Sequence, residues 1–293
     1  MKICMILVGL LGAYIIWQKW ELTRFRTKEY QITSDKIKED ASVVVIADLH
    51  GYTYGAKNSR LLKQVDVCHP QAILIAGDLI VSKYAKTFPV ALDFLMELVK
   101  IAPVYYCFGN HETRLRNKKK INHEAFIKYL DQVQKIGVTI LNNQSVHLLL
   151  GQNKVTLSGL ELGIDYFEKG KQTSLDPQHL KKILGISDAN AFQILLAHNP
   201  TYAKEYAQWG ADVTFCGHNH GGLIRIPGIG SLLSPQLIFF PKYDSGMFSF
   251  YDKKVVVSRG LGTHTFHIRI FDRAELLNIS LTRQSKHNIK TKS

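Results

Sequence analysis

The chain has 293 residues, of which 46% are apolar and 21% charged, and this composition can bury one large core rather than two small ones. Lys and Arg outnumber Asp and Glu by 37 to 24, a formal net charge of +13, which favours an anionic partner such as phosphate, nucleic acid or lipid headgroups without choosing among them. The four cysteines lack the Cys-x-x-Cys spacing of zinc sites. Three of them, Cys68, Cys107 and Cys216, lie in or beside apolar runs, so we expect no disulfide framework.

The N-terminus carries an uncharged apolar run from Ile3 to Trp17, flanked by Lys2 and Lys19. The run is shorter than the roughly 20 residues of a full span, but Gln18 and the flanking aromatic residues can sit in the membrane interface. No small-residue cleavage site follows, which favours an uncleaved anchor over a signal peptide. We therefore expect residues 1–19 to be the transmembrane helix of a single-pass cell-membrane protein. A buried N-terminal core helix is the alternative, although the run has no polar face.

The orientation in the membrane stays open at this point. The basic residues that follow the apolar run, taken literally, keep the C-terminal side in the cytoplasm, but they outnumber Lys2 and the amino terminus by a small margin. Residues 20–40 are polar and charged and predict a juxtamembrane linker. We expect the folded domain over residues 41–281 and a basic tail over residues 282–293.

From Ala41 onward, apolar strand-like runs alternate with amphipathic helical segments. We predict strands at residues 42–48, 72–78, 103–110, 138–141, 146–150, 154–160, 192–198, 211–220, 247–251, 254–258 and 276–281. We predict helices near residues 58–65, 88–100 and 123–135, a helix that starts at Asp176-Pro177, and another after Pro200. The alternation is typical of βαβ units. The strands at 146–150 and 154–160 predict an antiparallel pair, and this mixed order suits two facing sheets flanked by helices.

Five short polar blocks follow the predicted strands. They are Asp48-Leu49-His50, Gly77-Asp78, Gly109-Asn110-His111-Glu112, His198 and Gly217-His218-Asn219-His220. Each block alone has an ordinary interpretation as a cap, a turn residue or a packed histidine. Together they supply carboxylate, amide and imidazole donors at strand ends, which are the ligands that a pair of divalent metal ions needs.

In this order the five blocks resemble the calcineurin-like metallophosphoesterase superfamily, over roughly Ala41 to Leu281. The resemblance implies an α/β fold, a four-layered α/β/β/α sandwich of two mixed sheets flanked by helices, here preceded by one N-terminal hydrophobic helix. It also implies two divalent metal ions, for which the mixed nitrogen and oxygen donors suit Mn, Fe or Zn.

The resemblance assigns roles to individual residues. One metal ion would be held by Asp48, His50 and His220, the other by Asn110, His198 and His218, with Asp78 bridging the two and His111 facing the substrate as the catalytic histidine. Two cations neutralised by two carboxylates can hold a hydroxide that attacks phosphorus, and His111 would stabilise or protonate the leaving oxygen.

Further segments resemble the membrane-tethered phosphodiesterase branch of that superfamily. These are Gly221-Gly222-x-Ile224-Arg225-x-Pro227, Phe240-Pro241-Lys242-Tyr243 and Ser258-Arg259-Gly260-Leu261-Gly262. Some members of the branch hydrolyse the pyrophosphate of UDP-diacylglucosamine, and others are poorly defined phosphodiesterases. Leu223 departs from the pattern, because relatives often carry Gln there.

Three other features have both a functional and an ordinary interpretation. Arg225 and Arg259 lie beside glycines and are candidate substrate-binding residues, or else surface arginines near turns. Glu112 is a candidate for orienting a ligand imidazole, or else a solvated glutamate. The basic segment at residues 114–120 can meet anionic headgroups, but a solvated loop explains it more simply.

These features predict a membrane-anchored, binuclear metal-dependent phosphodiesterase or pyrophosphatase that acts on a lipid-linked or nucleotide-linked phosphate. A nuclease or cyclic-nucleotide phosphodiesterase with the same metal centre is the second hypothesis, favoured by the positive charge but not by the anchor. A non-catalytic interaction protein on this fold is the third, and it should have lost ligands, whereas this chain retains all seven. We infer no protein partner, and we do not expect nucleic acid to be the partner.

Overall fold

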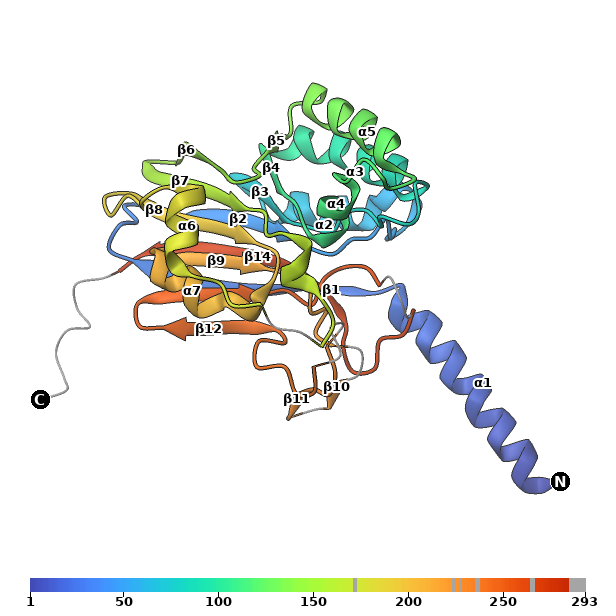
Figure 1. Cartoon of the computed structure of the whole chain (residues 1–293). Helices are drawn as coiled ribbons and strands as arrows, with labels where there is room; N and C mark the ends of the chain where they lie inside the picture. The colour runs from blue at the N-terminus through green and yellow to red at the C-terminus, as the bar shows by residue number, and fades with distance from the viewer. Residues whose placement is uncertain (171–172, 223–224, 227, 235–237, 264–266, 285–293) are drawn as a thin grey trace, which may run out of the picture.

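The computed structural model describes residues 1–170, 173–222, 225–226, 228–234, 238–263 and 267–284, so Leu223, Ile224 and Pro227 lie outside the described residues. Two six-stranded sheets pack against each other with helices on their outer sides, and α1 (Lys2–Leu22) extends away from this body (Figure 1). The expected α/β fold of two mixed sheets with a preceding apolar helix is confirmed.

The first sheet has the strand order β1-β14-β2-β3-β4-β5. The strands β2 to β5 run parallel to one another, as the βαβ pattern predicts, while β14 is antiparallel to β2 and parallel to β1. The bounds are β1 (Phe25–Ser34), β2 (Ala41–Ile46), β3 (Ala72–Ala76), β4 (Val104–Cys107), β5 (Thr139–Ile140) and β14 (Ala274–Arg283).

The second sheet has the order β12-β13-β9-β8-β7-β6. Its four central strands are parallel, and an antiparallel strand pairs at each edge, including the predicted pair β6 and β7. The bounds are β6 (Gln144–Leu150), β7 (Asn153–Leu160), β8 (Phe192–Ala197), β9 (Val213–Cys216), β12 (Gly246–Phe250) and β13 (Lys253–Val257), with a separate small hairpin of β10 (Arg225–Ile226) and β11 (Gly230–Ser231).

The helices connect successive parallel strands. The α-helices are α2 (Ser59–Val67), α3 (Thr87–Ile101), α4 (Asn110–Leu115), α5 (His123–Lys135), α6 (Pro177–Leu184) and α7 (Ala203–Trp209), and short 3-10 turns cover Ala56–Asn58, Ile164–Phe167 and Pro200–Tyr202. The predicted helix at residues 123–135 is confirmed residue for residue, and α6 begins at Pro177 as expected, with Asp176 accepting a bond from the amide of Gln178.

Alternate residues of β2 show how the layers are held together. Val43 and Val45 belong to the apolar core between the two sheets, whereas Val44 and Ile46 face a second core beneath α2, α3 and α5. A third core lies between the second sheet and α6 and α7. Because successive side chains of a strand point to opposite faces, a strand buried on both faces reads as the continuous apolar run seen here.

The linker expected at residues 20–40 is wrong. Residues 25–34 form β1, which pairs with β14 in a continuous register from Phe25–Ala274 to Ser34–Arg283. Backbone pairing with β14 holds this edge strand in place. Ile32 is its one buried side chain, so the sequence of β1 shows almost no apolar pattern. The folded part therefore begins before Ala41, and β14 also continues to Arg283, beyond the expected boundary at residue 281.

The helix α1 is the one helix of the described part of the chain that is long and apolar enough to cross a membrane. In its most apolar window, Met5–Leu22, 11% of the residues are buried against the rest of the protein. Length and composition agree with the predicted anchor, and they are weak evidence because signal sequences and core helices can share them.

Candidate metal centre

The predicted ligands follow parallel strands whose carboxyl ends meet at one edge of the two sheets. Asp48 follows β2, Asp78 follows β3, Asn110 starts the helix after β4, and His198 and His218 follow β8 and β9. Backbone bonds join neighbouring ends: the amide of Asp48 donates to the carbonyl of Gly77 at 3.0 Å, and the amide of Gly217 donates to that of His198 at 3.1 Å. The amide of His218 donates to the carboxylate of Asp48 at 3.1 Å, a bond that joins segments 170 residues apart in the chain.

Five of these donor residues have left-handed backbone conformations. The φ angles are 53° at Asp48, 52° at His50, 56° at Asp78, 69° at His218 and 51° at His220. Such conformations are uncommon for residues with a side chain and cost free energy. Their concentration at one point in the fold is typical of a functional site, where the chain turns sharply to aim a side chain.

Two glycines leave room for the carboxylates. A Cβ at Gly217 would overlap the carboxylate of Asp48, and a Cβ at Gly109 would overlap the carboxylate of Asp78. Gly109 and Gly217 are the first residues of two of the conspicuous sequence blocks. Their presence is therefore explained by close approach of a neighbouring strand end.

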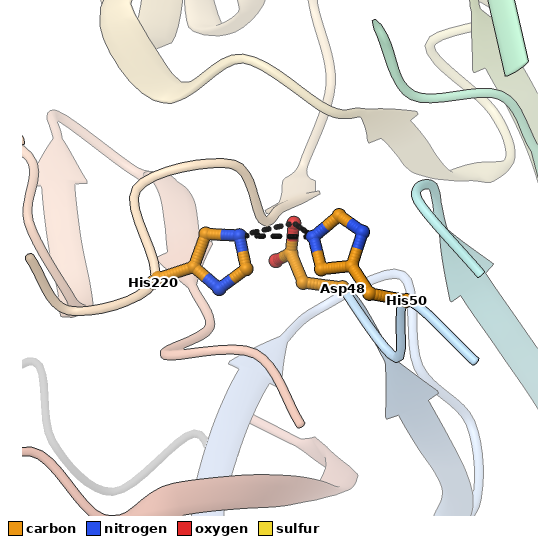
Figure 2. Close-up of side chains that lie close together, drawn as sticks. All are labelled: Asp48, His50 and His220. Atoms are coloured by element: carbon orange, nitrogen blue, oxygen red, sulfur yellow. Dashed lines mark hydrogen bonds and ion pairs between the residues drawn. The ribbon is translucent and has the colours of Figure 1, made fainter. Parts of the chain in front are cut away.

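Asp48, His50 and His220 form one donor cluster. Nε2 of His50 lies 3.1 Å from Nε2 of His220, and Oδ1 of Asp48 lies 3.9 Å and 3.4 Å from these two nitrogens. Figure 2 shows the two imidazoles on either side of the Asp48 carboxylate. With metal–ligand bonds of about 2.1 Å, neighbouring ligands of one ion lie about 3.0–3.4 Å apart, so two of the three separations match those of a shared metal ion.

The second cluster contains Asp78, His198 and His218, with Asn110 beside it. Nε2 of His198 lies 3.2 Å from Oδ2 of Asp78, and Nδ1 of His218 lies 2.9 Å from Oδ1 of Asn110. Nδ1 of His198 donates to the carbonyl of Ala76 at 2.7 Å. Nε2, once deprotonated, is therefore the ring nitrogen that can coordinate a metal ion. Oδ2 of Asp78 is also 3.9 Å from Nε2 of His50, so Asp78 lies between the two clusters.

Burial and mutual charge give the centre a strong demand for a cation. Burial raises the pKa of Asp48 to about 7. Burial acts in the same direction on Asp78, but the imidazoles around it, His198 foremost, outweigh it and hold the pKa of that carboxyl well below its usual range. Burial lowers the pKa of His198, yet Asp78 outweighs this effect and raises it to about 10. Without metal, the proton on His198 balances the negative charge of the carboxylates. A bound metal ion can take over that role.

His111 is buried beside both clusters. Its amide donates to Oδ1 of Asp78 at 2.9 Å, and its ring is 5.0 Å from that of His50. The backbone amide of Ser82 donates to Nδ1 of His111 at 3.0 Å. Because Nδ1 accepts this bond, the proton of the neutral ring is on Nε2. No sequence signal pointed to Ser82, whose hydroxyl lies 3.1 Å from the same Nδ1 that its backbone amide contacts.

Glu112 is fully buried and is not a solvated surface residue. One carboxylate oxygen accepts from the amides of Asp78 and Gly109, both at 3.0 Å, and the other accepts from the amide of Ile80 at 3.4 Å and the hydroxyl of Tyr106 at 2.6 Å. Its acceptor capacity is thereby filled. Glu112 fixes the backbone of two ligand-bearing loops, a different role from the imidazole orientation that we expected.

The two candidate substrate arginines pair with carboxylates inside the fold. Nη1 of Arg225 is 2.8 Å from Oδ2 of Asp244, and the guanidinium of Arg259 is 3.5 Å from Asp272 and 3.8 Å from Glu275. Their contact with phosphate stays a prediction.

A residue that the sequence did not single out, Arg269, lies behind the centre. Its buried guanidinium donates to the carbonyl of Gly262 at 2.9 Å, and that carbonyl accepts the Nδ1 proton of His220 at 3.1 Å. The Ser258–Gly262 segment resembles a family motif, but Arg269 has no such pattern around it. Arg269 therefore fixes His220, a predicted metal ligand, through one intervening carbonyl.

This fold and its adjoining Asp and His clusters place the protein among the enzymes that hydrolyse phosphate esters with the help of divalent metal ions. More specifically, the chain belongs to the calcineurin-like phosphoesterase family, which it matches over residues 41–222. The resemblance drawn from the five sequence blocks is confirmed, as is the expectation of divalent metal cofactors.

Curated relatives span most of the chain. Phosphodiesterase YaeI of Escherichia coli (strain K12) is 27% identical over 212 residues, which are 72% of this chain and 70% of the relative. UDP-2,3-diacylglucosamine pyrophosphatase LpxG of Chlamydia muridarum is 26% identical over 276 residues, 80% of this chain and 81% of the relative. Among solved structures, a dimetal phosphatase from Danio rerio has a TM-score of 0.42 and 13% identity, with 75% of this chain and 88% of that chain covered.

Proposed function

We propose that the protein is a membrane-anchored phosphodiesterase or pyrophosphatase that acts on a lipid-linked or nucleotide-linked phosphate. The observation that carries this proposal is the convergence of two carboxylates and five imidazoles into three overlapping buried groups: the two donor clusters described above, and a third formed by His50, Asp78 and His111. The names of YaeI and LpxG, a phosphodiesterase and a pyrophosphatase, support the reaction class. The exposed apolar helix α1 supports the anchor, and the side of the membrane on which the domain lies stays open.

We assign the seven donors to two divalent ions. One ion is assigned to Asp48, His50 and His220, the other to Asn110, His198 and His218, and Asp78 is assigned to both. When bound, such a pair of ions supplies Lewis acidity toward phosphoryl oxygens and activates water for hydrolysis. Within the described part of the chain, Nε2 of His218 is buried and has no hydrogen-bond partner. This supports its assignment as a metal ligand.

We assign proton donation to His111. The bond from the Ser82 amide to Nδ1 fixes the tautomer whose Nε2 carries the proton, and the bond from the His111 amide to Asp78 fixes the ring beside the centre. A neutral Nε2–H can hydrogen-bond a phosphoryl oxygen or the leaving oxygen as negative charge develops on it.

The proposal is tested with the full chain in detergent, stripped of metal and then supplied with Mn²⁺, Fe²⁺ or Zn²⁺ separately. We expect metal-dependent hydrolysis of bis-p-nitrophenyl phosphate and of a lipid-linked pyrophosphate. Asp78→Asn should abolish it, because Asp78 belongs to both clusters. Wild-type protein that binds no metal and hydrolyses neither compound would refute the proposal and favour an interaction protein on this fold.

A nuclease or cyclic-nucleotide phosphodiesterase is the second candidate, and the net charge of +13 favours it. Electrostatic binding of nucleic acid weakens steeply as salt concentration rises. Single-stranded DNA and a cyclic nucleotide are therefore compared with the lipid pyrophosphate at low and physiological salt. Preference for either nucleotide substrate at physiological salt would make this candidate the better one.

A further inference from the structure

The helix α1 joins the body of the protein without a flexible linker. Thr23 and Arg24 alone separate its last residue, Leu22, from the first residue of β1. The hydroxyl of Tyr52 donates to the carbonyl of Leu22 at 2.8 Å, and the guanidinium of Arg60 donates to that of Thr23 at 3.1 Å. The last residue of the helix and the residue that follows it are therefore both hydrogen-bonded to the domain.

Two polar residues in the last turns of α1 are buried against the segment that precedes β14. Gln18 and Arg269 exchange a reciprocal pair of bonds: Nε2 of Gln18 donates to the Arg269 carbonyl at 3.0 Å, and the Arg269 amide donates to Oε1 of Gln18 at 3.1 Å. The carboxylate of Glu21 accepts two bonds from Arg273, both at 3.0 Å. Breaking a buried pair leaves unsatisfied polar groups, so these contacts fix the direction of α1 relative to the domain.

The same Arg269 also contacts the segment that packs on the metal centre. Its guanidinium donates to the carbonyls of Gly260 and Gly262 at 3.2 Å and 2.9 Å. The Gly262 carbonyl accepts from His220, and a Cβ at Gly260 would clash with the side chain of Asp48. One buried residue thus bonds both to the base of α1 and to the segment that supports two predicted ligands, so Arg269 links the helix to the metal centre.

The uncharged run within α1 is shorter than the hydrocarbon core of a bilayer, so the polar and aromatic residues at its domain end have to complete the span. Ile3 to Trp17, at 1.5 Å per residue, rises roughly 22 Å, whereas a hydrocarbon core is about 30 Å thick. The junction surface, which we define as Trp20, Ile268 and Phe271, is 52%, 40% and 61% exposed. The ring of Phe271 lies 6.1 Å from that of Trp17, so this surface continues the apolar helix at its domain end.

Two arginines lie against the Trp20 end of the junction surface. The guanidinium of Arg24 lies 4.0 Å from the centroid of the Trp20 ring, and that of Arg273 lies 5.9 Å from it. Aromatic side chains next to arginines are characteristic of the headgroup level of a bilayer, where anionic phosphates pair with the cations. Burial of such a surface also relieves the mismatch between a short helix and a thicker membrane.

We propose that the junction surface rests on the bilayer and holds the metal centre at the headgroup level, so that the substrate is a phosphodiester or pyrophosphate carried by a membrane lipid. This inference rests on the proposed function and selects the lipid-linked substrate over the nucleotide-linked one. The substrate phosphate then reaches the centre while its acyl chains stay in the bilayer. A freely moving tether would give no such positional advantage, because it would not fix the height of the centre above the membrane.

The test uses two chromogenic substrates that differ only in membrane attachment. One is the p-nitrophenyl phosphodiester of diacylglycerol in phosphatidylcholine–phosphatidylglycerol vesicles, and the other is the same phosphodiester of glycerol in solution. Full-length protein is reconstituted in the vesicles with its metal. We expect kcat/KM for the acylated substrate to fall about tenfold or more in Phe271→Ser, while that for the glycerol ester changes less than about twofold.

Leu149→Ser is the matched control, because Leu149 is 68% exposed on β6, at the far side of the body from α1 (Figure 1). It should change neither rate. Equal loss of both rates in Phe271→Ser, no loss of either, or a wild-type enzyme that prefers the glycerol ester would overturn the docking inference and leave the proposed function standing. If the wild type hydrolyses neither of these esters, and neither bis-p-nitrophenyl phosphate nor the lipid-linked pyrophosphate, with any metal, the proposed function fails and the inference fails with it.

Discussion

Replacing Glu112 tests whether this buried carboxylate holds the two ligand-bearing loops together. In Glu112→Ala the amides of Asp78, Ile80 and Gly109 lose their acceptor. A buried unsatisfied group costs about 1–3 kcal/mol, so three amides correspond to about 3–9 kcal/mol, a large part of the roughly 5–15 kcal/mol that stabilises a typical domain. We expect Glu112→Ala to unfold or to melt at least about 6 °C lower, since 1 kcal/mol lowers the melting temperature by about 2–4 °C in a domain of this size.

Two milder variants make the test quantitative. Glu112→Gln keeps one oxygen for Asp78 and Gly109 and loses mainly the bond from Ile80, so we expect about 1–3 kcal/mol. Tyr106→Phe removes one hydroxyl donor and should cost about 1 kcal/mol. The assay is thermal melting of the metal-free full chain in detergent. A Glu112→Ala variant that melts within a few degrees of wild type, or a Tyr106→Phe variant that is equally destabilised, would refute this account.

Two further predictions concern the chemistry of the centre. His111→Ala should lower kcat by about 100-fold, in the range typical for a lost proton donor, while metal content by elemental analysis stays close to wild type; loss of both ions would show that His111 is a ligand. Metal affinity should fall as pH falls, because His198, with its pKa raised to about 10, and Asp48, with its pKa raised to about 7, must release protons to bind metal. Calorimetric titration should detect more protons released per bound ion at pH 6 than at pH 8, and equal release would contradict the reasoning.

The repeating part of the fold could be predicted because burial on both faces gives it a clear pattern. β3 (Ala72–Ala76) is buried at every residue, and its sequence is an uninterrupted apolar run. The site blocks were predictable for a related reason. Polar residues that directly follow such runs must emerge at the carboxyl edge of a parallel sheet, where the neighbouring strand ends bring them together.

The contacts that could not be predicted join residues far apart without a local pattern. Gln18 and Arg269 are 251 residues apart, and neither sits in a periodic or motif-bearing segment that would reveal the pairing. β1 escaped prediction because an edge strand with one buried side chain has the composition of a loop. The role of Glu112 depends on the spacing of two loops that its own sequence block does not describe.

The donor arrangement is unfavourable without a cation, and the surrounding sheets maintain it. Left-handed backbone at a residue such as Asp48 costs about 1–3 kcal/mol, and two buried carboxylates repel each other as well. Bonds such as those from the Asp48 amide to Gly77 and from the His218 amide to Asp48 hold this geometry within the frame of β2, β3 and β9. A metal ion that binds here would relieve the repulsion between the carboxylates. None of that free energy would have to be used to order the donor residues, because the sheets already hold them in place. We therefore expect a centre prepared in this way to bind its ions tightly and to present them to a phosphate in a fixed position.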